Sequence, residues 1–153
     1  MKGETSVISN SQIITSNNPS ICVIENYSYR FVDVVEGSHN MLSITLTFDN
    51  NNILDSIGLK YQAFVKDNDN VDMIKTNYQM QLEKSLGSDE LNPNMLNPSF
   101  YNNKDSIIFS LYLNKANLNK NTIKYFTIED VNSFTKTKII SYLENNNFKC
   151  TDS

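Results

Sequence analysis

The side chains that most often carry out chemistry in proteins are scarce in this chain. It has a single histidine, His39, and a single arginine, Arg30, among 153 residues. Hydrolysis and proton transfer depend mainly on histidine, cysteine and acidic side chains that meet at one site. Glu36 and Ser38 lie near the histidine, but neighbours in an extended turn point apart, and no Gly-x-Ser-x-Gly motif is present. We therefore predict a loop histidine without a catalytic role, and no enzymatic activity.

Three aspartates, Asp67, Asp69 and Asp72, stand close together, as the ligands of a calcium ion often do. An EF-hand loop also needs an oxygen donor where Val71 stands, then a glycine and a distal glutamate, and this sequence supplies none of them. We interpret the aspartates as acidic residues at the start of a helix, where their negative charges interact favourably with the positive end of the helix dipole. The four glycines are too far apart for a phosphate-binding loop. We predict no metal site and no cofactor.

Two cysteines, Cys22 and Cys150, lie near opposite ends of the chain and lack the Cys-x-x-Cys spacing of zinc and redox sites. The sequence leaves open whether they form a disulfide. A thiol dyad of Cys22 with His39 is compatible with the spacing, because such pairs need only meet in space. A cysteine within an apolar run such as Ile-Cys-Val-Ile is more often a small core residue.

The charge of the chain argues against nucleic-acid binding. Its net charge is −4 and its pI is about 4.9. Tyr27, Tyr29 and Phe31 alternate on one strand, with Arg30 on the other face, which resembles an aromatic platform for single-stranded bases. Such platforms lie in basic grooves, and here the lysines are scattered singly. We interpret the aromatic residues as contacts between strands, and we expect the isolated chain not to bind nucleic acid.

The sequence shows neither a membrane span nor a signal peptide. No stretch approaches the roughly 20 apolar residues that cross a bilayer, and polar residues follow the initial methionine. We expect a soluble protein, cytoplasmic by default. The abundance of Asn, Ile, Lys, Tyr and Phe, which have AT-rich codons, indicates a source with an AT-rich genome.

Period-2 patterns of apolar residues predict several strands. Leu42, Ile44, Leu46 and Phe48 alternate with Ser and Thr, which gives the clearest strand, and residues 61–65 could be its antiparallel partner. Further alternation predicts one long bent strand or two short ones over 21–35, and strands over 106–113 and 121–126. The polar residues 1–20 are expected to be a loosely ordered arm or an edge strand, and 21–153 a single globular domain.

Two segments have helical periodicity. Apolar residues at 71, 74, 78, 82 and 86 favour a helix that ends at Gly87, although alternation around Tyr78 leaves a strand open. The last segment predicts a helix that begins at Thr127, in a capping-box-like sequence, and ends at the asparagines 145–147.

These elements predict an α+β fold, with an antiparallel, β-rich sheet or small partly closed barrel, one inserted helix and a C-terminal helix. The scarcity of catalytic residues favours a non-enzymatic protein-binding or assembly module. Such a module would be a subunit or adaptor in a larger complex, or a viral or microbial host-interaction protein. The alternative is an OB-like barrel subunit of a nucleic-acid-associated complex, in which other chains supply the basic surface.

A candidate partner-binding segment lies in the long connection 88–105, because a loop of this length is usually functional or mobile. It carries many apolar side chains for a segment without periodicity. Either these side chains fold back over the sheet as a local cluster, or they form an exposed patch that a second chain covers. The residues concerned are Leu91, Met95, Leu96, Phe100 and Tyr101.

Overall fold

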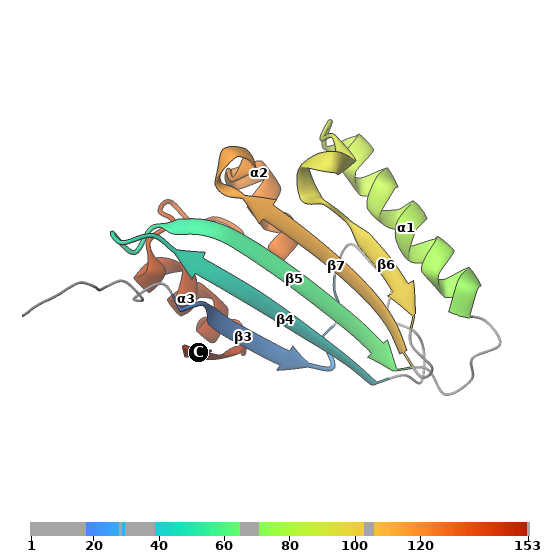
Figure 1. The fold of residues 1–153 in the computed structure, drawn as a ribbon, viewed down its shortest axis with the longest axis horizontal. Helices are drawn as coiled ribbons and strands as arrows, with labels where there is room; N and C mark the ends of the chain where they lie inside the picture. The colour runs from blue at the N-terminus through green and yellow to red at the C-terminus, as the bar shows by residue number, and fades with distance from the viewer. Residues whose placement is uncertain (1–17, 28, 30–38, 65–70, 103–105, 153) are drawn as a thin grey trace, which may run out of the picture.

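The computed structural model describes residues 18–27, 29, 39–64, 71–102 and 106–152. Its centre is a six-stranded antiparallel sheet with the strand order β6-β7-β5-β4-β3-β8 (Figure 1). The sheet is open rather than closed into a barrel, because β6 and β8 form two separate edges. The α+β class with an antiparallel sheet is thus confirmed. The strands are β3 (Ser20–Glu25), β4 (His39–Phe48), β5 (Leu54–Phe64), β6 (Ser99–Asn102), β7 (Ser106–Asn114) and β8 (Lys149–Asp152).

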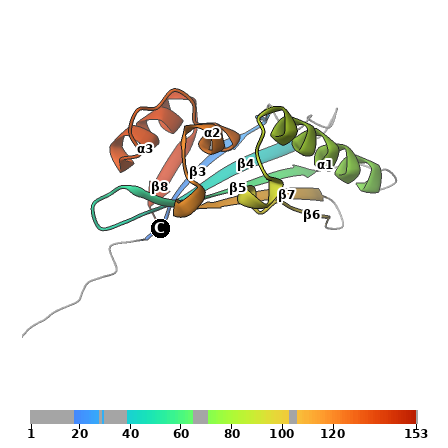
Figure 2. The same ribbon diagram turned by 90° about the horizontal axis from the view of Figure 1, so that it is seen from above.

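Three α-helices lie on the same side of this sheet (Figure 2). Helix α1 (Val71–Ser88) contacts β6 and β7, and α3 (Lys136–Asn145) contacts β8 at the opposite edge. The short helix α2 (Lys120–Ile123) lies between them, followed by the 3-10 turn η5 (Lys124–Phe126). We call the sheet face under the helices the covered face and the other face the open face. None of the described helices is long and apolar enough to cross a membrane.

Strand β4 confirms the clearest pattern in the sequence. Leu42, Ile44 and Leu46 are completely buried on the covered face, whereas Ser43 and Thr45, on the open face, are half-buried and exposed. The strand pairs with β3 on one side and β5 on the other, so that it is central in the sheet. The expected partner over 61–65 is part of β5, which begins earlier, at Leu54.

Helix α1 resolves the choice between helix and strand for residues 71–86. Tyr78, Leu82 and Leu86 are buried at a spacing of four residues, which places them on one helical face against the sheet. Gly87 lies within the last turn instead of following it. The left-handed residue that ends this segment is Glu90, with a φ of 57°.

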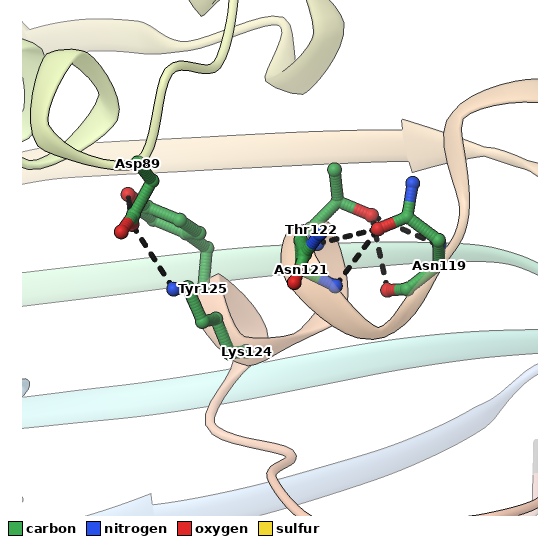
Figure 3. Close-up of polar contacts among 6 residues, drawn as sticks. All are labelled: Asp89, Asn119, Asn121, Thr122, Lys124 and Tyr125. Atoms are coloured by element: carbon green, nitrogen blue, oxygen red, sulfur yellow. Dashed lines mark hydrogen bonds and ion pairs between the residues drawn. The ribbon is translucent and has the colours of Figure 1, made fainter.

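The strand predicted over 121–126 is wrong, because this segment forms α2 and η5. The Asn119 side chain accepts hydrogen bonds from the backbone N–H groups of Asn121 and Thr122, and the Thr122 hydroxyl accepts one from the Asn119 N–H. This reciprocal capping box stabilises a helical turn where alternation indicates a strand. Figure 3 shows the cap beside the first turn of α2.

The C-terminal helix begins later than predicted. Its N-cap is Thr135, whose hydroxyl accepts from the Lys138 N–H, whereas Thr127 has a φ of 68° and ends η5. The intervening segment is tied to the sheet, because the Leu54 N–H donates to the Phe134 carbonyl oxygen at 2.8 Å. The core contact of Ile128, which is buried, is therefore made by an irregular segment rather than by a helix.

At the N-terminal side, β3 begins close to the expected position but ends at Glu25, and Asn26 follows with a φ of 57°. Most of the expected strand over 27–35, and residues 1–17 of the expected arm, lie outside the described residues. Strand β8, which the sequence did not predict, pairs with β3 and brings Cys150 opposite Cys22. The two cysteines form a disulfide.

The connection 88–105 contains regular structure instead of being a plain loop. Residues Pro93–Leu96 form the 3-10 turn η3, capped by the Asn92 side chain. Strand β6 follows and pairs with β7, which makes it one of the two edges of the sheet.

Candidate interaction surface

The structure separates the residues of the predicted partner-binding segment. Leu96 is completely buried, and Leu91 and Phe100 are half-buried against the core. The Phe100 ring packs on Phe109, with 4.9 Å between the ring centroids, on the covered face. Met95 is half-buried, and Tyr101 alone of the five predicted residues is exposed. The five side chains are therefore not brought together as one exposed patch.

Tyr101 instead belongs to the open face, whose central strands β4, β5 and β7 carry few charges. Side chains of β4, β5 and β7 alternate between the two faces, and the paired residues of the three strands give the membership of the open face directly. Lys60 carries the one formal charge among the central residues of this face. They are Met41, Ser43, Thr45, Thr47, Ser56, Gly58, Lys60, Gln62, Phe64, Ile108, Ser110, Tyr112 and Asn114.

Two exposed tyrosines lie on this face. Tyr101 is 47% exposed and Tyr112 is 46% exposed, and they flank the Ser99–Ser110 pair that lies between them. A Cβ atom on Gly58, opposite Tyr112, would meet only a backbone oxygen at 3.8 Å, so the space beside this tyrosine is open. Tyr112 was not among the predicted binding residues. The sequence does contain a signal of this face, because uncharged Ser and Thr residues alternate with the buried residues of β4.

At the β3 end of the sheet the surface is hollowed. Val23, Glu25 and Lys149, with Ile24 and Asn147, line a depression of about 520 Å³. This depression adjoins the edge at which β8 pairs with β3.

The histidine lies on the open face as well. The His39 Nε2 atom is 3.2 Å from a carboxylate oxygen of Glu25, and the His39 ring packs beside Phe64 with 5.8 Å between the centroids. Both side chains are more than half exposed, so the contact contributes little to stability. Cys22 is in a disulfide, and a thiol dyad with His39 is excluded.

A group of bonded polar side chains lies on the other side of the sheet, where the chain after α1 meets η5 (Figure 3). The Lys124 Nζ atom is 3.2 Å from Asp89 Oδ2, and the Tyr125 hydroxyl donates to the same carboxylate. The Tyr125 carbonyl oxygen in turn accepts a hydrogen bond from the buried Tyr29 hydroxyl. Because the charges are paired and the hydroxyls bonded, we interpret the group as a structural tie.

The described residues offer no further catalytic or metal-binding arrangement. No group of three His, Cys, Asp or Glu side chains among them could hold a metal ion. Asp67, Asp69, Arg30 and Phe31 lie outside the described residues, and Tyr29 is buried in the core rather than displayed on a platform.

Comparisons with known proteins add little to this geometry. No protein-family model matches the chain, and no curated protein matches it. A solved NMR structure of a protein from Streptococcus pneumoniae TIGR4 is 11% identical to it, with a TM-score of 0.46. That alignment covers 99% of this chain and 94% of the other.

Proposed function

We propose that this chain is a non-enzymatic protein-binding or assembly module that works as a subunit or adaptor. Its open face is the binding surface, with Tyr101 and Tyr112 as the aromatic anchors. The observation that carries the proposal is the composition of the central strands of this face, which are mostly polar, carry one formal charge at Lys60 and lie beside exposed tyrosines.

This composition is characteristic of interfaces. The centres of protein interfaces are depleted in charged residues and enriched in aromatic ones, and tyrosine with serine is the combination that antibody paratopes use. Tyrosine provides a large contact area at a low cost in side-chain entropy, while small hydroxyl side chains provide adaptable hydrogen bonds.

The alternative, a barrel subunit of a nucleic-acid-associated complex, finds less support. The sheet is open, and the aromatic residue at the centre of the expected base platform, Tyr29, is buried. A labelled single-stranded oligonucleotide tests this alternative directly. Binding at low salt that weakens steeply as salt increases would favour it over protein binding.

The test of the proposed function is a pair of matched substitutions. Thr45→Lys puts a charge at the centre of the open face, and Thr76→Lys puts the same charge on the exposed side of α1. Partners retained by tagged protein from the native source are identified by mass spectrometry. We expect the first variant to lose partners that wild type and the second variant retain, with both variants folded. Identical partners for all three proteins would contradict the proposal.

We further infer that the chain works in an oxidising compartment, in place of the cytoplasmic default. The disulfide between Cys22 and Cys150 supports this inference, because reducing systems keep most cytosolic thiols free. Alkylating free thiols in the native source before lysis should leave both cysteines unmodified. Modification of both would place the protein in a reducing compartment.

A further inference from the structure

The second edge of the sheet, β8, has features of a peptide-binding site. It is short, with four residues, and no strand in the described part of the chain pairs with its outer side. Exposed edges of this kind can accept an additional strand from another chain, which several peptide-binding domains exploit.

Two observations show which backbone groups of β8 point outward. The Cα atoms of Cys22 and Cys150 are 4.0 Å apart, the short separation of a pair without hydrogen bonds between strands. Independently, the Asn26 N–H donates to the Asn40 carbonyl oxygen at 2.9 Å, in register with the pairs of β3 and β4. Residues of β3 at even positions, including Cys22, therefore bond to β4.

It follows that Thr151 and Lys149 exchange hydrogen bonds with β3, since they lie opposite the odd-numbered residues Ile21 and Val23. The N–H and C=O groups of Cys150 and Asp152 then point away from the sheet. These groups are the donors and acceptors that an added strand needs.

A groove runs between this edge and helix α3. Its volume is about 380 Å³, and Cys150, Thr151 and Asp152 line it on the β8 side. Ile140 is the apolar side chain that α3 places in this groove, and Cys150 faces it from β8. A groove between an edge strand and a helix provides backbone bonds on one side and side-chain contacts on the other.

The ends of the groove differ in charge. At one end the Lys136 Nζ atom is 3.2 Å from Asp152 Oδ2, so these charges neutralise each other. At the other end Glu144 is exposed. The groove as a whole therefore has one surplus negative charge, which favours a basic residue in whatever occupies it.

We propose that this groove binds an extended peptide segment of another protein, which adds to β8 as an antiparallel seventh strand. An apolar β-branched side chain of that segment contacts Ile140, and a lysine or arginine two residues further on pairs with Glu144. The direction of the added strand sets the order of these two side chains. An antiparallel strand starts beside Asp152 and ends beside Lys149. Glu144 lies near Lys149 because the end of α3 leads into the start of β8, so the basic residue comes after the apolar one. This site is separate from the open face and does not depend on the proposed function.

The probe is a labelled peptide, Ser-Val-Ser-Val-Ser-Lys-Ser, compared with the same peptide with glutamate in place of lysine. We expect roughly fivefold tighter binding of the lysine peptide, which corresponds to about 1 kcal/mol, the upper range for exposed charge pairs. Glu144→Lys should reverse the preference. Glu83→Lys, an equal change on the exposed side of α1, should leave it unchanged.

Backbone pairing is tested by hydrogen exchange and by methylation. In the free protein the Cys150 and Asp152 amides should exchange faster than those of Lys149 and Thr151, and the peptide should slow the first two. Methylating the peptide amides that face β8 should abolish binding, whereas methylating the alternate amides should not. Absence of binding at millimolar peptide, or binding without protection of Cys150 and Asp152, would overturn the proposal.

Discussion

At the scale of single residues, Tyr61 is a tyrosine whose burial strongly raises its pKa. It is completely buried on the covered face, and its hydroxyl makes no hydrogen bond to any described residue. Burial raises its pKa to about 12 from the ordinary value of 10 because the charged form is not solvated there. The hydroxyl group therefore costs stability that a phenyl ring would not.

We expect Tyr61→Phe to raise the free energy of unfolding by about 1 kcal/mol, since it removes a buried polar atom without a partner. Tyr112→Phe, the same change at an exposed position, should have no measurable effect. Urea unfolding at neutral pH measures both variants. A clear loss of stability in Tyr61→Phe would show that the hydroxyl is bonded after all.

The same residue makes stability depend on alkaline pH. The unfolded state releases the Tyr61 proton near pH 10, whereas the folded state retains it up to about pH 12. Stability is therefore unaffected by this group below pH 10, and it falls as the pH rises from 10 through the folded-state pKa of about 12, because only the unfolded state ionises in that range. Between these values wild type should lose more stability than Tyr61→Phe. Parallel curves for the two proteins would contradict the raised pKa.

At the scale of elements, β4 depends on the burial of one set of alternating residues. Ile44→Asp puts a charge without a partner into the core and should cost more than about 4 kcal/mol, enough to unfold many domains of this size. Thr45→Asp places the same charge on the open face one residue away, where the side chain is exposed. Circular dichroism should show that only the first variant is unfolded, and two equally stable variants would contradict the strand register.

The segment after α1 allows a second test at this scale. Leu96→Ser with Phe100→Ser should lower stability by about 3–5 kcal/mol, because Leu96 is completely buried and Phe100 packs on Phe109. Tyr101→Ser, next to Phe100 but on the exposed face, should leave stability nearly unchanged while weakening the partner binding proposed above. Thermal unfolding separates the two. If the double variant were as stable as wild type, the segment would not contribute to the core.

At the scale of the whole molecule, the disulfide joins the first described strand to the last. Cys22 and Cys150 are 128 residues apart in sequence, so the bond restricts nearly the entire unfolded chain. Reduction should lower stability by roughly 2–5 kcal/mol. The variant Cys22→Ala with Cys150→Ala should not respond to reductant. Equal stability of wild type with and without reductant would mean that the bond does not form in solution.

Acid should weaken the attachment of β8 to β3, the edge that the disulfide also holds. The pKa of Asp152 is lowered, first by the hydrogen bond from the Ser20 hydroxyl and then by Lys136. A carboxylate whose pKa is lowered by folding stabilises the protein at pH values above the ordinary aspartate pKa. This stabilisation is lost as the pH falls through the lowered pKa of the folded state. Because the Asp152 side chain is largely exposed, this contribution is small, and it joins the disulfide in holding β8 on β3.

Elements with a local pattern could be predicted from the amino-acid sequence. Alternation in β4, β7 and part of β5, and the four-residue spacing in α1, follow from which side of one element faces the core. The α+β class with an antiparallel sheet followed from the same patterns. The prediction of a non-enzymatic role also came from the sequence alone, from the scarcity of histidine and arginine, and it stays a prediction.

Features that depend on distant contacts required the folded chain. Thr127 ends a turn instead of starting a helix because residues after it are bonded to the start of β5. The four residues of β8 are too few for a periodic signal, and their place in the sheet depends on pairing with β3 across more than a hundred residues. Cys22 pairs with Cys150 because the strand order places β8 beside β3. The open face is exposed because the helices all lie on the other side of the sheet. A linear sequence pattern encodes neither arrangement.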